Sequence, residues 1–476
     1  MSSGGDARIT MDPATGLNRY HSSPWPRDII AYASSTANDI SKAAFAHVQS
    51  VLAKHGQRIS APEFYQERLE HLRHTIRTAY DLPQTVQVAF APSGTDLEYI
   101  ALLSVKGDHK RPVHNILLGS DEVGSGCIHS AHGHYFSGET ALSIETVPGM
   151  PVDGLGDTSL QEFPVRDEAG VAYNSIEITG QIEPAIRAAL ERSERPLVHI
   201  VHGSKTGLIL PHLAEIDALR DKYGSDIAFV VDACQARITS AAIADYLQRD
   251  IMVFLTGSKF MGGPPFSGFA LMREDMLHSC GPIPAGLCNI FRRAEFPPAW
   301  PGQERLRADS NPGLLLRLEA SLFELERFQA LPTAEIRRIT DQFREATQWL
   351  CGQIGAEKVH SYPPGEKEEA RLHPLEMRTL VTINISDGTS LDFDDATRIH
   401  KAMVARDIRL GQPVRCVKWG NGRFGGTLRL GLSMPQMINL AALDDAGLAA
   451  KLREDMATIA GAYQEARDTA LIAADS

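Results

Sequence analysis

Cysteine is scarce in this sequence, which has six cysteines among 476 residues and no CxxC pair. That scarcity argues against a disulfide framework or a zinc ribbon, and we expect reduced thiols. Long basic runs are missing as well. Because 59 acidic residues outnumber 47 basic ones, giving a net charge of -12, we expect no nucleic acid partner.

The sequence also has no run of about 18 apolar residues, so we expect no membrane-spanning helix. Residues 1–6 lack the basic flank and apolar stretch of a signal peptide, which predicts a cytoplasmic location. Hydrophobic residues make up 43% of the chain and charged residues 22%, an ordinary globular composition. A well-formed core is therefore expected.

The length exceeds what one core normally supports, so we expect a large domain with a second lobe. Residues 1–60 are expected to form an N-terminal arm and helix, residues 61–320 a large domain, and residues 321–476 a small α+β domain. In the large domain, short β-branched runs alternate with helical stretches, which predicts an α/β fold with a mainly parallel sheet. The runs are Val86–Ala91, Asn115–Leu118, Leu197–His202, Ile227–Asp232, Met252–Thr256 and Gly268–Met272.

Three short segments that follow such runs carry the chemistry. The first, Ala91–Asp96, is a small-residue loop before a helical stretch, where free N–H groups suit a phosphate or where a hydroxyl simply caps the helix. The second begins at Asp232, whose carboxylate would project into a site at the carboxyl edge of a parallel sheet, unless it caps a helix. The third contains Lys259 in a glycine-rich apolar turn, where burial would lower the pKa of the amine and make it a nucleophile.

The order of these segments is specific: Ser-Gly-Thr at 93–95, Asp-Ala-Cys-Gln at 232–235 and Thr-Gly-Ser-Lys at 256–259, with Gly-Pro beyond. In this order they resemble the class V aminotransferase and cysteine desulfurase superfamily of pyridoxal phosphate (PLP) enzymes, which have fold type I. The resemblance spans about residues 60 to 435. It implies a PLP-dependent transferase or lyase that acts on a small α-amino acid.

The resemblance also implies roles for particular residues. Lys259 would form the Schiff base with PLP, Asp232 would bond the ring nitrogen, and Gln235 would bond the ring hydroxyl. Ser204 is the candidate polar residue near that hydroxyl and the substrate, whereas His202 is either a site residue or a satisfied core histidine. The residues implied at the PLP phosphate are Ser93, Gly94, Thr95, Thr256 and Ser258.

Arg429, in the segment Gly426–Ser433, resembles the arginine with which the family binds the substrate carboxylate. A guanidinium can clamp a carboxylate with two parallel bonds. A surface ion pair is the alternative for this side chain. The family is usually dimeric, which implies a homodimer in which Ser310 and Asn311 contact the partner's phosphate site.

The sequence departs from the family's pattern where many relatives stack an aromatic residue on the ring, because Val123 occupies that place. Either an aliphatic group or glycine backbone covers the ring, or His129 reaches in from the next turn. His129, His132 and His134 also have metal-ligand spacing, but no further ligand motif follows them, so we expect no metal.

A desulfurase needs a nucleophilic cysteine, and Cys416 is the candidate, with Arg415 and Lys418 nearby to favour its thiolate. Transamination, β-elimination, desulfuration, decarboxylation and carbon–carbon bond formation all remain open. Two readings from other classes are a metal-dependent hydrolase built on the histidines and a non-catalytic binding protein. The presence of both Lys259 and Asp232 argues against the last.

Overall fold

A computed structural model describes residues 1–474 apart from 108–110, 125, 361–375, 377–378, 387–390 and 421. At its centre lies an eight-stranded sheet with the order β2-β9-β8-β7-β5-β3-β4, in which β6 pairs with β5. The strands are β2 (Val86–Ala91), β3 (Val113–Leu118), β4 (Ser159–Phe163), β5 (Arg195–His202), β6 (Ile209–Leu210), β7 (Ala228–Asp232), β8 (Met252–Thr256) and β9 (Gly268–Arg273). Strands β8, β7, β5, β3 and β4 are parallel, whereas β9 runs antiparallel to β2 and β8. The mainly parallel sheet expected from the sequence is confirmed.

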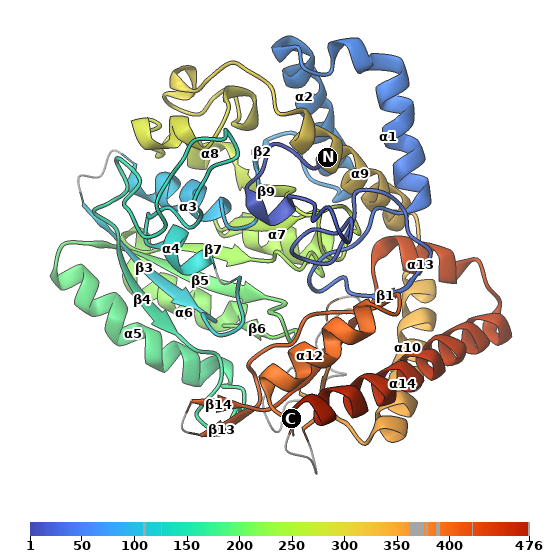
Figure 1. Cartoon of the computed structure of the whole chain (residues 1–476). Coiled ribbons are helices and arrows are strands. Elements are labelled where there is room, and N and C mark those ends of the chain that lie inside the picture. Colours follow the sequence, from blue (N-terminus) through green and yellow to red (C-terminus); the bar gives the residue numbers. More distant parts are fainter. Residues whose placement is uncertain are drawn as a thin grey trace.

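The central strands are mostly apolar because helices cover both faces of the sheet (Figure 1). In β8, Val253 and Leu255 belong to one hydrophobic cluster, while Met252 and Phe254 belong to another on the opposite face. This alternation follows from the two-residue period of a strand. A strand buried on both faces reads as a continuous hydrophobic run, which is why these strands were visible in the sequence.

Side-chain hydrogen bonds cap the first turns of several helices. Thr239 Oγ1 accepts a hydrogen bond from Ala242 N at 3.2 Å, and Asn174 with Glu177 forms a capping box. The helices are α1 (Lys42–His55), α2 (Pro62–Ala79), α3 (Leu97–Lys106), α4 (Cys127–Ala131), α5 (Ser175–Glu191), α6 (Leu213–Tyr223), α7 (Ser240–Gln248), α8 (Glu274–Leu277), α9 (Pro312–Gln329), α10 (Thr333–Ile354), α12 (Phe393–Val404), α13 (Met434–Ala441) and α14 (Asp445–Ala474).

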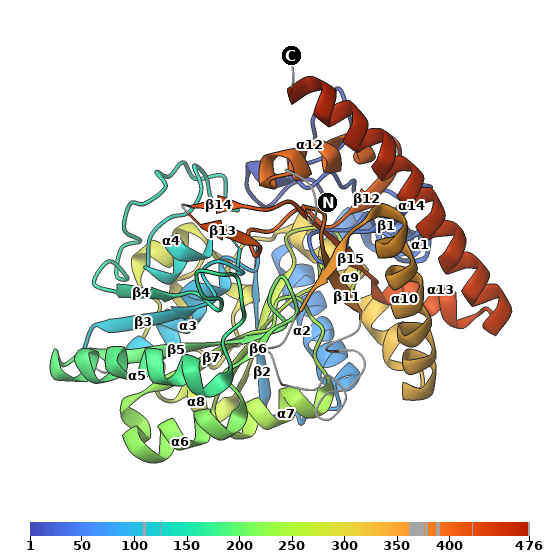
Figure 2. The ribbon, with the colours of Figure 1, turned by 90° about the horizontal axis from the view of Figure 1, so that it is seen from below.

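A second lobe forms around an antiparallel sheet of β10 (Glu357–Val359), β11 (Leu380–Asn384) and β15 (Thr427–Gly431). Helices α10, α12 and α14 gather beside it, in orange and red in Figure 2. A hairpin of β13 (Lys418–Gly420) and β14 (Arg423–Phe424) extends from this lobe. The α+β character of the second lobe agrees with the expectation from the sequence.

The N-terminal segment takes part in both lobes. Its strand β1 (Ile30–Tyr32) pairs in parallel with β12 (Ile408–Leu410) of the second lobe, while α1 packs against α9. The expected domain boundaries at residues 60 and 320 stay a prediction. Within the described part of the chain, every helix is too short or too polar to cross a bilayer.

Candidate active site

A cavity of about 390 Å³ lies where the loops after β2, β3, β5, β7 and β8 meet residues of the second lobe and of the N-terminal arm. Ligands of open α/β sheets bind at this carboxyl edge of the strands. Its volume falls in the range of small-molecule sites. The lining residues are Arg8, Arg19, Tyr20, Ser35, Thr36, Ser93, Gly94, Thr95, Gly124, Gly126, Cys127, Lys205, Asp232, Cys234, Thr256, Ser258, Lys259, Pro265, Phe266, Gln412 and Arg429.

The Ser-Gly-Thr loop forms one end of the cavity, between β2 and the first turn of α3. Ser93 Oγ donates to Asp96 Oδ2 at 2.6 Å, which ties the loop to the start of the helix. A Cβ on Gly94 would lie 2.8 Å from Thr256 Cγ2, so this position needs glycine for the β2 and β8 loops to meet. The first and third segments of the sequence motif are therefore in direct contact.

Lys259 follows β8, Asp232 is the last residue of the neighbouring strand β7, and both line the cavity. The Lys259 amine forms no hydrogen bond or ion pair with any described residue. Its backbone, in contrast, is held: Asn38 Nδ2 donates to the carbonyls of Lys259 at 2.7 Å and Ser258 at 3.1 Å. Asp232 Oδ1 accepts from Cys234 N at 2.9 Å. The lysine thus has a fixed backbone and a free nucleophile.

Behind Asp232 lies a buried pair formed by Glu98 of α3 and His199 of β5. His199 Nε2 is 3.3 Å from Glu98 Oε2, and both side chains are almost fully buried. Burial lowers the pKa of His199 to about 4 and raises that of Glu98 well above its usual value; Asp232 adds to the second shift. His199 pairs with Val230, two residues before Asp232, so His199 and Asp232 share a face of the sheet. Sequence analysis did not single out this pair.

Arg429 of β15 reaches the cavity from the second lobe. Its Nε donates to Gln412 O at 2.7 Å and its Nη2 to Thr36 Oγ1 at 2.9 Å. The side chain is buried, which lowers its pKa to about 10, and no carboxylate among the described residues pairs with it. The surface ion pair considered as an alternative is therefore wrong. A buried guanidinium without a counter-ion is suited to an incoming carboxylate.

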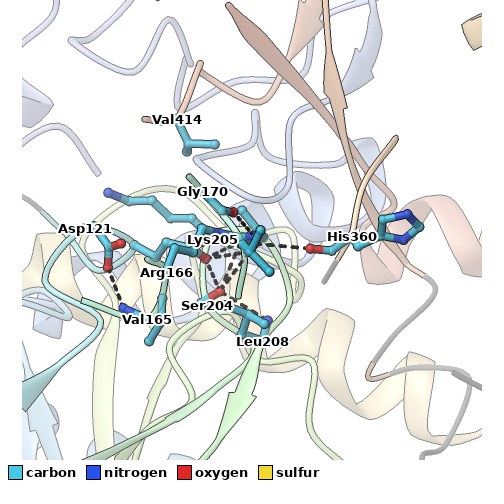
Figure 3. A network of polar contacts seen from close by, with 12 residues as sticks. Asp121, Val165, Arg166, Gly170, Ser204, Lys205, Leu208, His360 and Val414 are labelled. Carbon is cyan, nitrogen blue, oxygen red and sulfur yellow. Dashed lines mark hydrogen bonds and ion pairs between the residues drawn. The ribbon is translucent and has the colours of Figure 1, made fainter. Parts of the chain in front are cut away.

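Lys205 is the lining residue from the loop after β5, next to the expected Ser204. Ser204 Oγ instead donates to the carboxylate of Glu122, which also accepts from Thr206 Oγ1 at 2.5 Å. Arg166 Nε donates to the same carboxylate at 2.6 Å, so this part of the loop is held by a buried polar network (Figure 3). Ser204 does not line the cavity, and its role at the cofactor stays a prediction.

The N-terminal segment supplies five lining residues that sequence reasoning missed: Arg8, Arg19, Tyr20, Ser35 and Thr36. The Arg8 guanidinium lies over the rings of Phe136 and Phe266, 4.9 and 4.7 Å from their centres, and pairs with Asp6 at 2.8 Å. These contacts join segments far apart in the chain. No local motif marks them.

Five other expected site residues lie outside the lining of the cavity: Gln235, His202, Ser310, Asn311 and His129. Gln235 is buried, where its amide accepts from Arg237 Nη1 at 2.9 Å and donates to Ser35 O at 3.3 Å. His202 is buried, with Nδ1 3.0 Å from the hydroxyl of Tyr246 and Nε2 3.6 Å from Glu376 Oε1, and the choice between its two roles stays a prediction.

Ser310 Oγ donates to Ser60 O at 2.8 Å, and Asn311 caps α9 by accepting from Leu314 N at 3.0 Å. His129 is exposed on α4. Contacts of Ser310 and Asn311 with a partner subunit stay a prediction.

Cys416 does not have the environment expected of an activated thiolate. It is 2% exposed, and burial together with the charge of Glu122 raises its pKa to about 12. Arg415 packs over the ring of Phe393, 4.7 Å from its centre, and Lys418 Nζ donates to a backbone carbonyl at 3.1 Å. The expectation that these two cations favour the thiolate was wrong because both are engaged elsewhere.

Two other thiols, those of Cys127 and Cys234, line the cavity. Burial raises the pKa of Cys127 to about 12. Val123, expected at the place of the ring-stacking residue, is buried outside the lining, and Gly124, Gly126 and Cys127 line the cavity instead. Glycine backbone with a thiol thus occupies the wall of the cavity formed by this segment.

The histidine cluster shows no metal-binding arrangement. The His132 and His134 rings meet edge to face, with centres 4.2 Å apart. Across the described residues, no group of three or more histidine, cysteine or acidic side chains is placed to hold a metal ion. The metal-hydrolase reading therefore has no geometric support in that part of the chain.

Comparison with protein-family models gives no match, and comparison with curated protein sequences gives none either. Solved structures do match. A cysteine desulfurase from Thermococcus onnurineus NA1 superposes with a TM-score of 0.57 at 16% identity, over 93% of this chain and 95% of that one. Pyridoxamine-pyruvate aminotransferase from Mesorhizobium loti gives 0.54 at 15% identity, over 95% and 98%.

Serine palmitoyltransferase from S. paucimobilis gives a TM-score of 0.52 at 14% identity, over 93% of this chain and 88% of that one. These similar structures carry the names of enzymes with different reactions, so the likeness extends to the fold and not to one activity. The expectation from the sequence resemblance is confirmed at that level. The chain has the fold of the fold-type-I PLP-dependent enzymes.

Proposed function

We propose that this protein is a PLP-dependent enzyme that acts on an α-amino acid, with Lys259 as the residue that binds the cofactor covalently. One observation carries the proposal: a single cavity is lined by Lys259, Asp232, the Ser93–Thr95 loop and Arg429. These groups come from four separate segments of the chain. Their convergence is what the sequence resemblance requires and what chance placement would not produce.

The residues present fit this cofactor. At one end, the loop before α3 meets Thr256 and Ser258, which together offer hydroxyl and backbone N–H donors for a phosphate. Asp232 offers a carboxylate for a pyridinium nitrogen, and Lys259 offers an amine without a competing partner. When bound, the cofactor supplies an electron sink for carbanion chemistry at the substrate's Cα.

The protein's own groups would then position the substrate. Arg429 would take the substrate's α-carboxylate, because its guanidinium is buried, unpaired with a carboxylate and oriented by Gln412 and Thr36. Lys259 would move the proton at the substrate's Cα, since its amine lines the cavity while its backbone is held by Asn38. The buried Glu98–His199 pair lies close enough to feel the charge of Asp232.

Transamination is the reaction that we favour, and β-elimination, decarboxylation or carbon–carbon bond formation are the alternatives on the same site. Desulfuration through Cys416 is disfavoured, because that thiol is buried outside the cavity lining and has a raised pKa. The cavity-lining thiol of Cys127 also has a pKa raised to about 12, which leaves it a poor nucleophile near neutral pH. We propose a homodimer and a cytoplasmic location as well. Sedimentation equilibrium would test the first.

The covalent role of Lys259 is tested by borohydride reduction of the PLP-loaded protein followed by peptide mass spectrometry. Reduction fixes the cofactor on the lysine that holds it, so we expect the added mass on the peptide containing Lys259. The variant Lys259→Ala should lose both this adduct and the visible absorbance band of the imine. The exposed Lys54→Gln should keep both. An adduct that persists at full yield in Lys259→Ala would contradict the assignment.

A further inference from the structure

The amine of Lys205 is an unused cation inside the candidate active site. The side chain lines the cavity, and its Nζ makes no hydrogen bond or ion pair with any described residue. Among the charged groups around it, Arg429 and Lys259 repel the amine and Glu122 attracts it. Burial, followed by the charges of Arg429 and Lys259, lowers its pKa to about 8.

The loop that carries Lys205 is anchored on both sides of the residue. Lys205 N donates to Glu122 O at 3.2 Å, and Thr206 N donates to the Glu122 carboxylate at 3.2 Å. Burial would raise the pKa of Glu122, but Arg166 and the hydroxyls of Ser204 and Thr206 hold it below its usual value. Figure 3 shows Lys205 beside this network. The network fixes the backbone from which the amine extends.

The charge of the cavity favours an anionic ligand. Five cations line it against one carboxylate, that of Asp232; the cations are Arg8, Arg19, Lys205, Lys259 and Arg429. Arg8 is neutralised by Asp6, Lys259 is assigned to the cofactor, and Arg429 to the α-carboxylate. Arg19 and Lys205 are left. Lys205 lies beside Arg429, whose Nη1 donates to the Lys205 carbonyl at 3.5 Å. A partly buried cation next to a second cation is unfavourable unless an anion joins them.

The place of Lys205 along the sheet separates it from the phosphate end. The Ser93–Thr95 loop follows the edge strand β2, whereas Lys205 follows β5, with β9, β8 and β7 between them. Asp232, at the carboxyl end of β7, therefore lies between the phosphate end and Lys205. The anion that Lys205 meets is accordingly on the substrate side, where Arg429 enters.

We propose that Lys205 binds a second anionic group on the substrate, so that the enzyme acts on amino acids whose side chains end in an acid. This inference rests on the proposed function, because it takes Arg429 as the α-carboxylate site. Such a substrate places two negative charges against two adjacent cations. A neutral amino acid leaves Lys205 without a partner and binds more weakly.

The test measures the binding of aspartate and glutamate, and of their neutral counterparts asparagine and glutamine, to the PLP-loaded full-length protein. The readout is the change in cofactor absorbance. A charge-assisted hydrogen bond contributes a factor of about 10 to 100 in affinity. We therefore expect the better of the two acids to bind at least about tenfold more tightly than its amide. Lys205→Gln should abolish this preference, while Lys205→Arg and the exposed Lys54→Gln should retain it.

The preference should also depend on pH in the unmodified protein. Because the pKa of Lys205 is about 8, the amine is charged below that pH and neutral above it. The acid-over-amide ratio is thus expected to decline as pH rises through 8, a readout that needs no variant to fold. Arg429 stays charged over this range, so binding of the amides should change less.

Two results would overturn the inference while leaving the proposed function intact: equal binding of acids and amides by the unmodified protein, or a Lys205→Gln variant that weakens both equally. The latter would assign Lys205 a general role, such as carrying a proton. Failure of the unmodified protein to bind PLP at all would instead overturn the proposed function, and this inference with it.

Discussion

At the scale of single residues, the site depends on cations that are buried without a protein counter-ion. Arg429 is the clearest case, because its bonds go to three backbone carbonyls and the hydroxyl of Thr36 rather than to a carboxylate. Of the five N–H donors of the guanidinium, one on Nη2 has no acceptor among the described residues, and the two contacts of Nη1 are long, at 3.4 and 3.5 Å, so these groups can turn to a ligand. Lysine would keep the charge but lose the paired donors and the bonds that orient them.

We therefore predict that Arg429→Lys raises the KM for the preferred amino acid by about tenfold or more, with a smaller effect on kcat. Steady-state kinetics with that substrate would measure both constants. Arg423→Lys, on the exposed hairpin that precedes β15, is the matched control and should leave both unchanged. A fall in kcat with KM unchanged would instead indicate a role in the chemical step.

At the scale of elements, the pairing of β1 with β12 fastens the N-terminal segment to the second lobe. A buried ion pair strengthens the attachment of this segment. Arg409 Nη2 lies 2.6 Å from Asp39 Oδ2, and the two side chains are 2% and 8% exposed. Asp39 also accepts from Ser23 N at 2.6 Å. The same segment supplies Asn38, which holds the backbone of Lys259. The segment whose contacts stabilise this attachment therefore also positions the backbone of Lys259.

Removing one partner of this pair should be costly, because it leaves the other charge buried and unpaired. We predict that Asp39→Asn lowers the free energy of unfolding by about 3 kcal/mol. Urea denaturation followed by circular dichroism would measure the loss. Asp407→Asn breaks the pair between Arg27 and Asp407, in which Asp407 is 64% exposed, and should cost less than about 1 kcal/mol. Equal losses in the two variants would contradict this account.

At the scale of the whole molecule, buried neutral histidines set the response to acid. Burial lowers the pKa of His400 to about 4 from an ordinary value of 6.5, and its Nε2 lies 3.0 Å from Leu410 O. The unfolded chain therefore binds a proton at this residue at a pH where the folded protein does not. The contribution of the neutral His400 to the free energy of unfolding is fully present above pH 6.5 and is lost as pH falls toward 4.

The expected loss from His400 between pH 7 and pH 5 is about 2 kcal/mol. We predict that His400→Gln, which keeps a hydrogen bond donor for Leu410 O, removes about this much of the difference between unfolding free energies measured by urea at the two pH values. His129→Gln, at an exposed position on α4, is the control. An undiminished pH dependence in His400→Gln would show that other groups dominate.

The cofactor-binding segments could be predicted from the sequence because each is local. Ser93 and Lys259 follow strands that are mostly apolar, Asp232 is the last residue of another such strand, and parallel strands bring their carboxyl ends to one edge. A continuous apolar run thus indicated both the strand and the place where its loop opens. The expected lining positions agree with the cavity at these three segments.

Other parts of the site depended on details that no local pattern encodes. Whether Ser204 or Lys205 lines the cavity depends on how Glu122 and Arg166 hold one turn, which shifts the lining by a single residue. In the segment after β3, Cys127 lines the cavity and the expected Val123 does not.

By itself, the sequence determined the parallel sheet, the three motif segments and their order along the chain, because hydrophobic periodicity and loop composition are local properties. Only the tertiary structure decided that Arg8 and Tyr20 of the arm close the cavity, that Cys416 is buried outside its lining, and that a free amine stands beside Arg429. These features arise from contacts between segments hundreds of residues apart. Burial and charge at such contacts depend on the packed fold as a whole.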